Sequence, residues 1–257
     1  MPVPHDAPAP SPVTAAMVVI GDEILSGRTQ DSNFAYVAKV LGALGIDLKE
    51  GRFVPDDEAE IVAAVNALRA RYTYVFTSGG IGPTHDDITA DAIAKAFGVG
   101  IDYHPEVLKM LTARYKPGEF NEMRKRMARI PETATLITNT VSAAPGFQID
   151  NVFVMAGVPM IFRAMLEDAA PRLARGAVVI SATISARIAE GRMAAALAQM
   201  QAIHKSVAIG SYPFYREDGF GVQLVVRGRD AAAVEAAAQA IEAAVRAEGV
   251  EPERLQS

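Results

Sequence analysis

The segment TYVFTSGGIGPTHDDITADAIAKAFG, residues 73 to 98, carries the pattern that decides the fold. It runs from a short apolar strand, TYVFTS, through a turn with three glycines into a helix. Ile93 and Phe97 are expected to face the core from this helix, and Gly98 to end it. A strand that leads through a turn into a helix is the repeating step of a parallel sheet, whose ligands bind at the carboxyl ends of the strands. We therefore expect a binding site at this glycine turn.

The chain repeats this alternation up to about residue 174. Short apolar runs predict strands at residues 17–20, 46–54, 146–149 and 151–156. Asp31 is placed to cap the helix after the first strand, and Pro159 to open the helix after the last. Asp57 and Glu60 form a capping box before another helical pattern. The sequence predicts an α/β fold in which helices cover both faces of a mainly parallel sheet that includes a hairpin.

A change of composition near Ala174 divides the chain into domains. The part that follows is predicted as strand, helix, strand, strand and helix, an order that resembles half of a ferredoxin-like sandwich. We predict a larger domain over residues 15–174 and a small α+β domain over 175–250. The first 14 residues hold five prolines and are expected to be a disordered tail, and residues 251–257 a second tail.

Composition and charge exclude several classes of function. The chain has 257 residues and no cysteine, which rules out disulfides, cysteine-bound zinc and a thiol nucleophile, and favours a reducing compartment. A net charge of −5 leaves no basic field for a broad nucleic-acid interface. The sequence shows no signal peptide and no apolar stretch of the roughly 18 residues that a membrane helix needs. We expect a cytoplasmic protein with no nucleic-acid or membrane partner.

The glycine turn suits a phosphate group. Glycines let backbone amides approach an anion closely, and the start of a helix adds about half a positive charge. The turn matches neither the P-loop nor the dinucleotide fingerprint, so the glycines alone are not specific. Asp86 and Asp87 follow directly, and the sequence leaves two interpretations of them open. Either Thr84 caps the helix with both acids in its first turn, or the two carboxylates hold a divalent metal beside the phosphate.

A second acidic turn, GDEILSG at residues 21–27, favours the metal. It also follows a buried strand, so Asp22 and Glu23 should emerge at the same edge of the sheet as Asp86 and Asp87. Four carboxylates could then meet at one site. The acidic pair at residues 56 and 57 is a further candidate, although helix capping already accounts for it.

The other polar features have simpler interpretations. GVP at residues 157–159 could present more backbone amides, but it is also ordinary punctuation between a strand and a helix. The basic run RKR at residues 124–126 is typical of a solvated helix face. We assign no chemistry to His5, His104 and His204.

Several motifs together resemble a known family. GDEILSG, QDSNFAYVAKVLGALG, SGGIGPTHDDIT, MARIP, APGF and GVP occur in the order found in the competence- and damage-inducible CinA family. They are also similar to the molybdopterin-binding-like domain of eukaryotic FAD synthase, and the resemblance covers about residues 16 to 173. It implies a three-layer αβα sandwich of the MoaB and MogA type. The small domain resembles the segment that follows in those proteins.

The resemblance also implies roles for single residues. It makes Asp22, Glu23, Asp86 and Asp87 the catalytic acids, with Asp22, Asp86 and Asp87 as metal ligands. The implied ligand-binding residues are Gly21, Ser78, Gly79, Gly80, Gly82, Thr84, His85, Pro145, Gly146, Gly157 and Pro159. MAGVP stands where the family usually has LPGVP, which puts the group bound there in doubt. The deamidase and adenylyltransferase activities of the longer relatives are not expected.

Three functions follow as expectations. The leading one is a metal-dependent nucleotide pyrophosphatase that acts on ADP-ribose or FAD with Mg²⁺, Mn²⁺ or Co²⁺. The second is a molybdopterin-binding or adenylyltransferase-like protein of molybdenum cofactor metabolism. The third is a module that binds its ligand without turning it over. In each case the partner is a small nucleotide or pterin, and a homo-oligomer is expected, with a dimer favoured.

Overall fold

The computed structural model describes residues 12–116, 119–217 and 219–255. The chain forms two compact units, Met1–Gly176 and Ala177–Ser257. Each is described by itself below. The tail expected over the first residues lies outside the described part up to residue 11.

The larger unit is built on a six-stranded sheet in the order β2-β1-β3-β8-β7-β6. β2, β1, β3 and β8 pair in parallel, and β7 runs antiparallel between β8 and β6 at one side of the sheet. The strands are β1 (Thr14–Ile20), β2 (Asp47–Val54), β3 (Tyr74–Ser78), β6 (Thr135–Ile137), β7 (Gly146–Ile149) and β8 (Val152–Met155). The predicted hairpin is confirmed, since Phe147 of β7 pairs with Val154 of β8.

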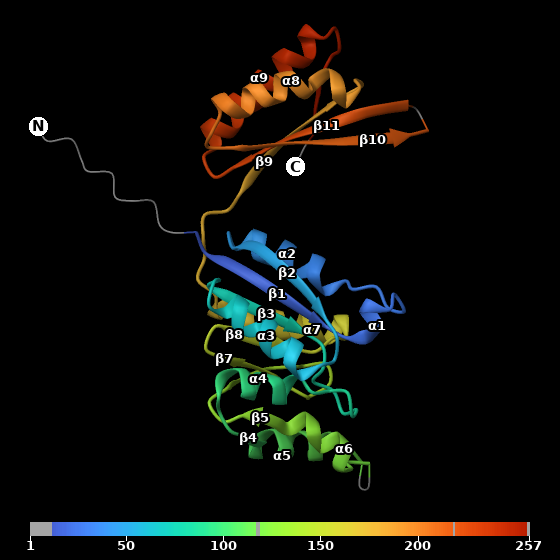
Figure 1. Cartoon of the computed structure of the whole chain (residues 1–257), viewed down its shortest axis with the longest axis vertical. Helices are drawn as coiled ribbons and strands as arrows, with labels where there is room; N and C mark the ends of the chain where they lie inside the picture. Colours follow the sequence, from blue (N-terminus) through green and yellow to red (C-terminus); the bar gives the residue numbers. More distant parts are fainter. Residues whose placement is uncertain (1–11, 117–118, 218, 256–257) are drawn as a thin grey trace, which may run out of the picture. The chain divides into compact units, whose positions relative to one another are not determined.

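Helices cover both faces of this sheet, as Figure 1 shows. α2 (Asn33–Ala43) and α7 (Pro159–Ala169) pack on one face. α3 (Glu58–Arg69), α4 (Thr89–Phe97) and α5 (Pro105–Arg114) pack on the other. The shorter elements are α1 (Asp22–Leu25), β4 (Ile101–Tyr103), α6 (Glu122–Lys125), η1 (Arg126–Ala128), β5 (Arg129–Pro131) and η2 (Ala170–Arg172).

Strand β1 shows why three layers form. Its side chains alternate between the two faces, and both sets are buried, because every residue from Ala15 to Ile20 is apolar. Ala16 and Val18 belong to the core under α3, α4 and α5. Met17 and Val19 belong to the core under α2 and α7. A strand that is apolar on both sides must be covered on both sides, and the predicted αβα sandwich is confirmed.

Most predicted helix signals are also confirmed. The Asp57 carboxylate accepts a hydrogen bond from the Glu60 backbone N–H at 3.0 Å, at the start of α3. The Asp31 carboxylate accepts from the Phe34 N–H at 2.9 Å, at the start of α2. Pro159 is the first residue of α7. Each contact satisfies a backbone group that the first turn of a helix leaves without a partner.

The small unit is a four-stranded sheet with two helices on one face. Its elements are β9 (Ile180–Ala186), α8 (Glu190–Ile203), β10 (Ala208–Arg216), β11 (Gly219–Gly228), α9 (Ala231–Ala247) and β12 (Glu253–Leu255). Ile184, Leu224 and Ile241, from β9, β11 and α9, are fully buried together in its core. The predicted α+β domain is confirmed.

Strand β12 corrects the sequence analysis, which placed a tail over residues 251–257. Glu253–Leu255 instead pair with β9 in an antiparallel ladder. Arg254 donates hydrogen bonds to Glu242 at 2.8 Å and to Glu235 at 2.7 Å, both on α9. These contacts hold the strand on the sheet and against α9, so the tail is wrong for these three residues. The last two residues lie outside the described part.

Among the described residues, no helix is long and apolar enough to cross a membrane.

Candidate functional site

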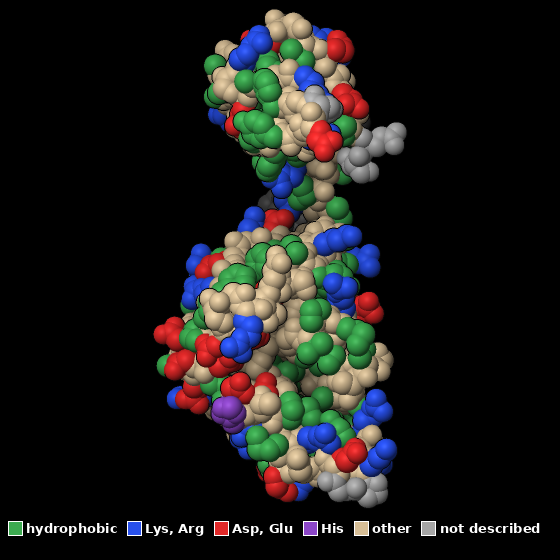
Figure 2. All heavy atoms as spheres, turned by 90° about the vertical axis from the view of Figure 1, so that its right-hand side faces the viewer, with side chains coloured by type: hydrophobic (Ala, Val, Ile, Leu, Met, Phe, Trp, Pro, Cys, Tyr) green, Lys and Arg blue, Asp and Glu red, His purple; other side chains and the backbone are tan. Residues whose placement is uncertain are grey.

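Four strand ends meet at one edge of the larger unit, because β1, β2, β3 and β8 run parallel and their carboxyl ends point the same way. The turns that follow them begin at Gly21, Pro55, Gly79 and Ala156. Figure 2 looks onto this edge and shows acidic side chains gathered beside a hollow in the surface. The edge is therefore the candidate site.

A cavity of about 620 Å³ opens here. That volume lies within the range of about 300 to 1,000 Å³ that small-molecule sites occupy. All four turns contribute to its wall, together with the region around Ser142. Of the predicted site residues, those that line it are Gly21, Glu23, Gly79, Gly80, Gly82, Asp86, Asp87, Gly157 and Pro159. The two acidic turns that the sequence analysis expected side by side thus lie at one cavity.

Two glycines give the turn after β3 its path. Gly79 has a φ of +112° and Gly80 a φ of +69°, a region that glycine adopts far more readily than other residues. A Cβ on Gly79 would lie 2.2 Å from the Ile20 carbonyl oxygen, and a Cβ on Gly80 would lie 2.1 Å from the Thr89 hydroxyl. The turn can run this close to β1 and α4 only because both residues lack a side chain.

Two polar side chains that the sequence analysis did not single out fix this turn. Asn33, 2% exposed at the start of α2, donates from Nδ2 to the Ser78 hydroxyl and to the Gly157 carbonyl, both at 2.8 Å. Thr89, fully buried, donates its hydroxyl to the Gly79 carbonyl at 3.0 Å. Asn33 therefore joins the ends of β3 and β8. No local pattern marks either residue, because their partners are distant in sequence or depend on the shape of the turn.

Asp56 is the centre of the acidic wall. Its Oδ2 accepts a hydrogen bond from the Asp22 backbone N–H at 3.0 Å, which ties the turn after β2 to the turn after β1. Burial raises the pKa of Asp56 above its usual value. The nearby charges of Asp22, Glu23 and Asp86 raise it further, against the Asp22 hydrogen bond, which lowers it. Helix capping alone does not account for the acidic pair at residues 56 and 57, because Asp56 lines the cavity together with Glu23 and Asp86.

In one of the two interpretations of the loop, Thr84 caps the helix, with Asp86 and Asp87 in its first turn. This interpretation is wrong, because α4 begins at Thr89 and not after Thr84. Thr84 donates its backbone N–H at 2.7 Å and its hydroxyl at 2.5 Å to Asp87 Oδ2. The Asp87 carboxylate is thus held by its own loop. Asp86 is more open, and the nearby Thr84 side chain and its own backbone lower its pKa.

The charged side chains described in the cavity wall are all acidic. Glu23, Asp56, Asp86 and Asp87 line it, and none of the described residues in its wall is Lys, Arg or His. A ligand with phosphate groups would be repelled unless a cation came with it. Within the described part, no group of three or more His, Cys, Asp or Glu is arranged to hold a metal ion by itself. The carboxylates of this wall fit Mg²⁺ in one way: one or two of them bind the ion, and the phosphates of the substrate supply further ligands.

Several predicted site residues do not line this cavity. Asp22 contributes its backbone N–H to Asp56. Ser78 is buried and accepts from Asn33, and the side chain of His85 is 92% exposed. Gly146 lies within β7, where a Cβ would meet the Val154 carbonyl at 2.4 Å, so its role is packing. The two remaining residues outside the wall are Thr84 and Pro145.

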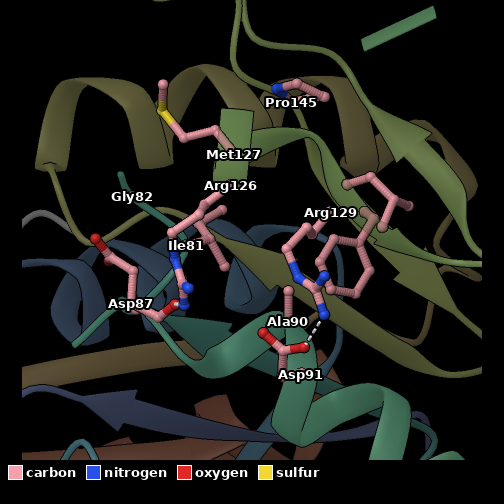
Figure 3. A pocket seen from close by; sticks show the side chains of 12 residues that line it. Ile81, Gly82, Asp87, Ala90, Asp91, Arg126, Met127, Arg129 and Pro145 are labelled. Atoms are coloured by element: carbon pink, nitrogen blue, oxygen red, sulfur yellow. Dashed lines mark hydrogen bonds and ion pairs between the residues drawn. The ribbon is translucent and has the colours of Figure 1, made fainter. Parts of the chain in front are cut away.

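A narrow crevice of about 10 Å³ adjoins the glycine turn, and Pro145 lies in its wall. Figure 3 shows two guanidinium groups at it, those of Arg126 and Arg129. Arg129 pairs with Asp91, and the hydrogen bond to this carboxylate raises the pKa of Arg129. Arg126 donates from Nη2 to the backbone carbonyl of Asp87 at 3.3 Å. The prediction that the basic run forms a solvated face is wrong for Arg126, which lines this crevice.

Two known families match the chain. Residues 16–175 match the family described as "Probable molybdopterin binding domain". Residues 178–254 match the one described as "FAD synthase, middle domain". The boundary between the two matches coincides with the boundary between the two compact units.

Relatives and solved structures agree with these matches. A protein of Pyrococcus abyssi is 34% identical over 239 residues, which cover 86% of this chain and 92% of that protein. A protein of Thermococcus kodakarensis is 40% identical over 176 residues, which cover 63% of this chain and 70% of that protein. The crystal structure of the protein CinA from Thermoplasma acidophilum is 32% identical and covers 62% of this chain and 96% of that chain, with a TM-score of 0.59.

Proposed function

The chain belongs to the family of probable molybdopterin-binding domains, and from that premise we propose that its larger unit hydrolyses the pyrophosphate of a nucleotide such as ADP-ribose or FAD with a divalent metal. The observation that carries the proposal is the composition of the cavity wall. Residues of the glycine turn line the same cavity as carboxylates that have no basic partner in the wall. A pyrophosphate bound through a cation complements both.

The chain's own groups divide the work of binding and proton transfer. The turn at Gly79 and Gly80 lets the phosphates approach the backbone, and Asn33 and Thr89 hold that turn in place. Glu23 and Asp86 would hold the metal, which when bound lowers the pKa of its water and screens the phosphate charge.

Asp56 is the residue best placed to take up the proton of the attacking water. Its raised pKa makes this carboxylate a stronger base than an ordinary aspartate. In the hydrolysis, the water oxygen bonds to one phosphorus atom, the bridging P–O bond breaks, and the water proton goes to the carboxylate.

Apolar side chains also line the cavity and suit the flat ring of a nucleotide or pterin. They are Tyr115, Met127, Ile161 and Met165. They support binding of either ring system, so the same cavity also supports the second expectation, adenylyl transfer from ATP to a pterin phosphate.

Purified protein incubated with ADP-ribose or FAD and Mg²⁺, Mn²⁺ or Co²⁺ tests the proposal. We expect release of AMP, and we expect Asp56→Asn to abolish it. Asp102→Asn is the matched control, because Asp102 lies on β4, outside the cavity wall. Absence of AMP under all three metals would end the hydrolase proposal. Transfer of AMP from ATP to a pterin phosphate would favour the transferase instead.

We also propose that the chain forms a homo-oligomer, with a dimer favoured. Strand β10 is at the edge of the small unit's sheet, so one side of its backbone has no strand neighbour there. Light scattering after size-exclusion chromatography measures the mass, and a monomer at micromolar concentration would contradict the proposal.

A further inference from the structure

Arg126 is a cation beside the glycine turn that has no acidic partner among the described residues. The other charged groups of its run and of its crevice are engaged. Lys125 pairs with Glu122 at 2.5 Å, and Arg129 pairs with Asp91. Arg126 has one contact, its weak hydrogen bond to the Asp87 carbonyl. A positive charge at this place is therefore available to a ligand.

The donors of Arg126 are only partly used. Its Nε is buried and has no hydrogen-bond partner. A buried donor without a partner costs folding free energy, and most such groups in proteins are satisfied. An acceptor oxygen that a ligand brings into the crevice would satisfy this Nε.

The size of the crevice limits what that acceptor is. About 10 Å³ is the space of about one water molecule, so a whole phosphate group does not enter, but a single oxygen atom does. The crevice and the main cavity share five wall residues: Gly80, Ile81, Gly82, Asp87 and Met127. A ligand in the main cavity could therefore extend one oxygen into the crevice.

We propose that Arg126 and this crevice form an anion subsite that binds a phosphoryl oxygen of the ligand. The inference rests on the proposed function, because it assumes that the main cavity takes a phosphorylated nucleotide or pterin. The acids at Glu23 and Asp86 hold the end of the ligand that carries the cation, and Arg126 holds a phosphoryl oxygen that the cation does not cover. The two ends fix the direction in which the ligand lies across the glycine turn.

The test compares each phosphorylated compound with its dephosphorylated form. The pairs are AMP with adenosine, and neopterin monophosphate with neopterin, which separate a nucleotide source of the phosphoryl group from a pterin source. Calorimetry at one fixed Mg²⁺ concentration gives the dissociation constants for the full chain. None of these compounds contains a pyrophosphate, so hydrolysis does not disturb the measurement.

Arg126→Met removes the charge and all donors while keeping an apolar stem. We expect it to weaken binding of the phosphorylated compound by about tenfold to a hundredfold, the range of a hydrogen bond to a charged group, and to leave the dephosphorylated compound within about twofold. Arg126→Lys keeps the charge but lacks the Nε–H, so its affinity for the phosphorylated compound should lie between those of the wild type and Arg126→Met. It also replaces Arg126→Met in the test if that variant does not fold. Lys125→Met is the matched control from the same basic run and should change neither compound.

Equal weakening of both members of a pair would show a structural effect and overturn the subsite. Wild-type protein that binds neither AMP nor neopterin monophosphate more tightly than its dephosphorylated form would overturn it too. The outcome is independent of catalysis. A protein that hydrolyses ADP-ribose and keeps its AMP affinity in Arg126→Met retains the proposed function and loses this inference. If Arg126→Met loses the AMP affinity but the wild-type protein never hydrolyses ADP-ribose, the subsite is supported and the proposed function is lost.

Discussion

The substitution Gly79→Ala tests whether the glycine turn has the geometry on which the site depends. With a φ of +112°, an alanine at this position is strained by about 1–3 kcal/mol. Its Cβ would also lie 2.2 Å from the Ile20 carbonyl oxygen. Relief of that clash requires movement of backbone between two hydrogen-bonded strands, which costs about 1–3 kcal/mol more.

The lower entropy of alanine in the unfolded chain offsets about 0.4–1 kcal/mol of this. We therefore expect Gly79→Ala to destabilise the larger unit by about 3 kcal/mol, within a range of about 1–5.6 kcal/mol. For a unit of this size, 1 kcal/mol shifts the Tm by about 2–4 °C, so the central value corresponds to a fall in Tm of about 6–12 °C.

Gly42→Ala is the matched control, with the same chemical change in the same unit. Gly42 lies within α2, its φ is ordinary, and a Cβ there would meet no atom within 4 Å. We expect it to stabilise the unit by about 0.5–1 kcal/mol, because alanine favours a helix.

Scanning calorimetry of the full chain measures both substitutions, and the transition of the small unit serves as an internal reference. A Gly79→Ala protein whose larger unit melts within about 2 °C of the wild type would refute the argument. The turn would then tolerate a side chain, and the close approach to Ile20 would not require glycine.

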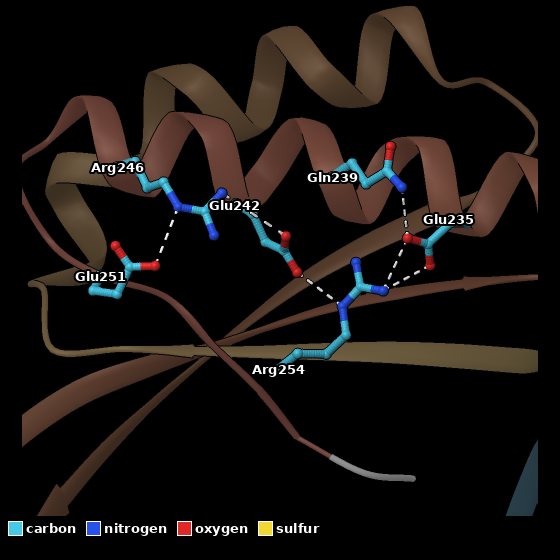
Figure 4. Close-up of polar contacts among 6 residues, drawn as sticks. All are labelled: Glu235, Gln239, Glu242, Arg246, Glu251 and Arg254. Carbon is cyan, nitrogen blue, oxygen red and sulfur yellow. Dashed lines mark hydrogen bonds and ion pairs between the residues drawn. The ribbon is translucent and has the colours of Figure 1, made fainter.

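Three further changes test other parts of the structure. Asn33→Ala should destabilise the larger unit by about 1–3 kcal/mol, because the buried Ser78 hydroxyl and the Gly157 carbonyl lose their donor, and urea denaturation measures this. The pKa of Asp56 is raised in the folded protein, so ionisation of this group lowers the free energy of unfolding as the pH rises from about 3.8 through the folded pKa. Asp56→Asn should therefore be more stable than the wild type at pH 7. The difference in stability should vanish below pH 3.8. Arg254→Ala should lower the Tm of the small unit, less so in high salt, because the contacts of Arg254 with Glu235 are solvent-exposed (Figure 4).

Sequence patterns predicted the parts of the fold that depend on neighbouring residues. The apolar run of β1, the cap at Asp57 and the proline at the start of α7 are all local signals, and each appears where it was expected. Strand β12 was missed for the opposite reason. Three residues are too short to show a period of two, and their place is fixed by β9, almost 70 residues earlier, and by side chains of α9.

The basic run at residues 124–126 shows the same limit within the site. Three adjacent cations look alike in sequence, yet their surroundings separate them. Arg124 lies over the ring of Tyr115, Lys125 pairs with Glu122, and Arg126 lines the crevice at the glycine turn. The difference comes from the short α6 and η1 segment, which turns each side chain in another direction. A local pattern does not specify those directions.

The two Asp-Asp pairs explain why the acidic site was only partly predictable. In each pair one aspartate builds the turn: Asp57 caps α3, and Asp87 accepts from Thr84. The other aspartate, Asp56 or Asp86, faces the acidic wall of the cavity. A structural role for one aspartate of a pair therefore leaves the role of its neighbour unexplained. The structural aspartate fixes the loop from which its neighbour reaches the site. A carboxylate next to such a turn-building aspartate at the end of a strand is therefore a candidate site residue.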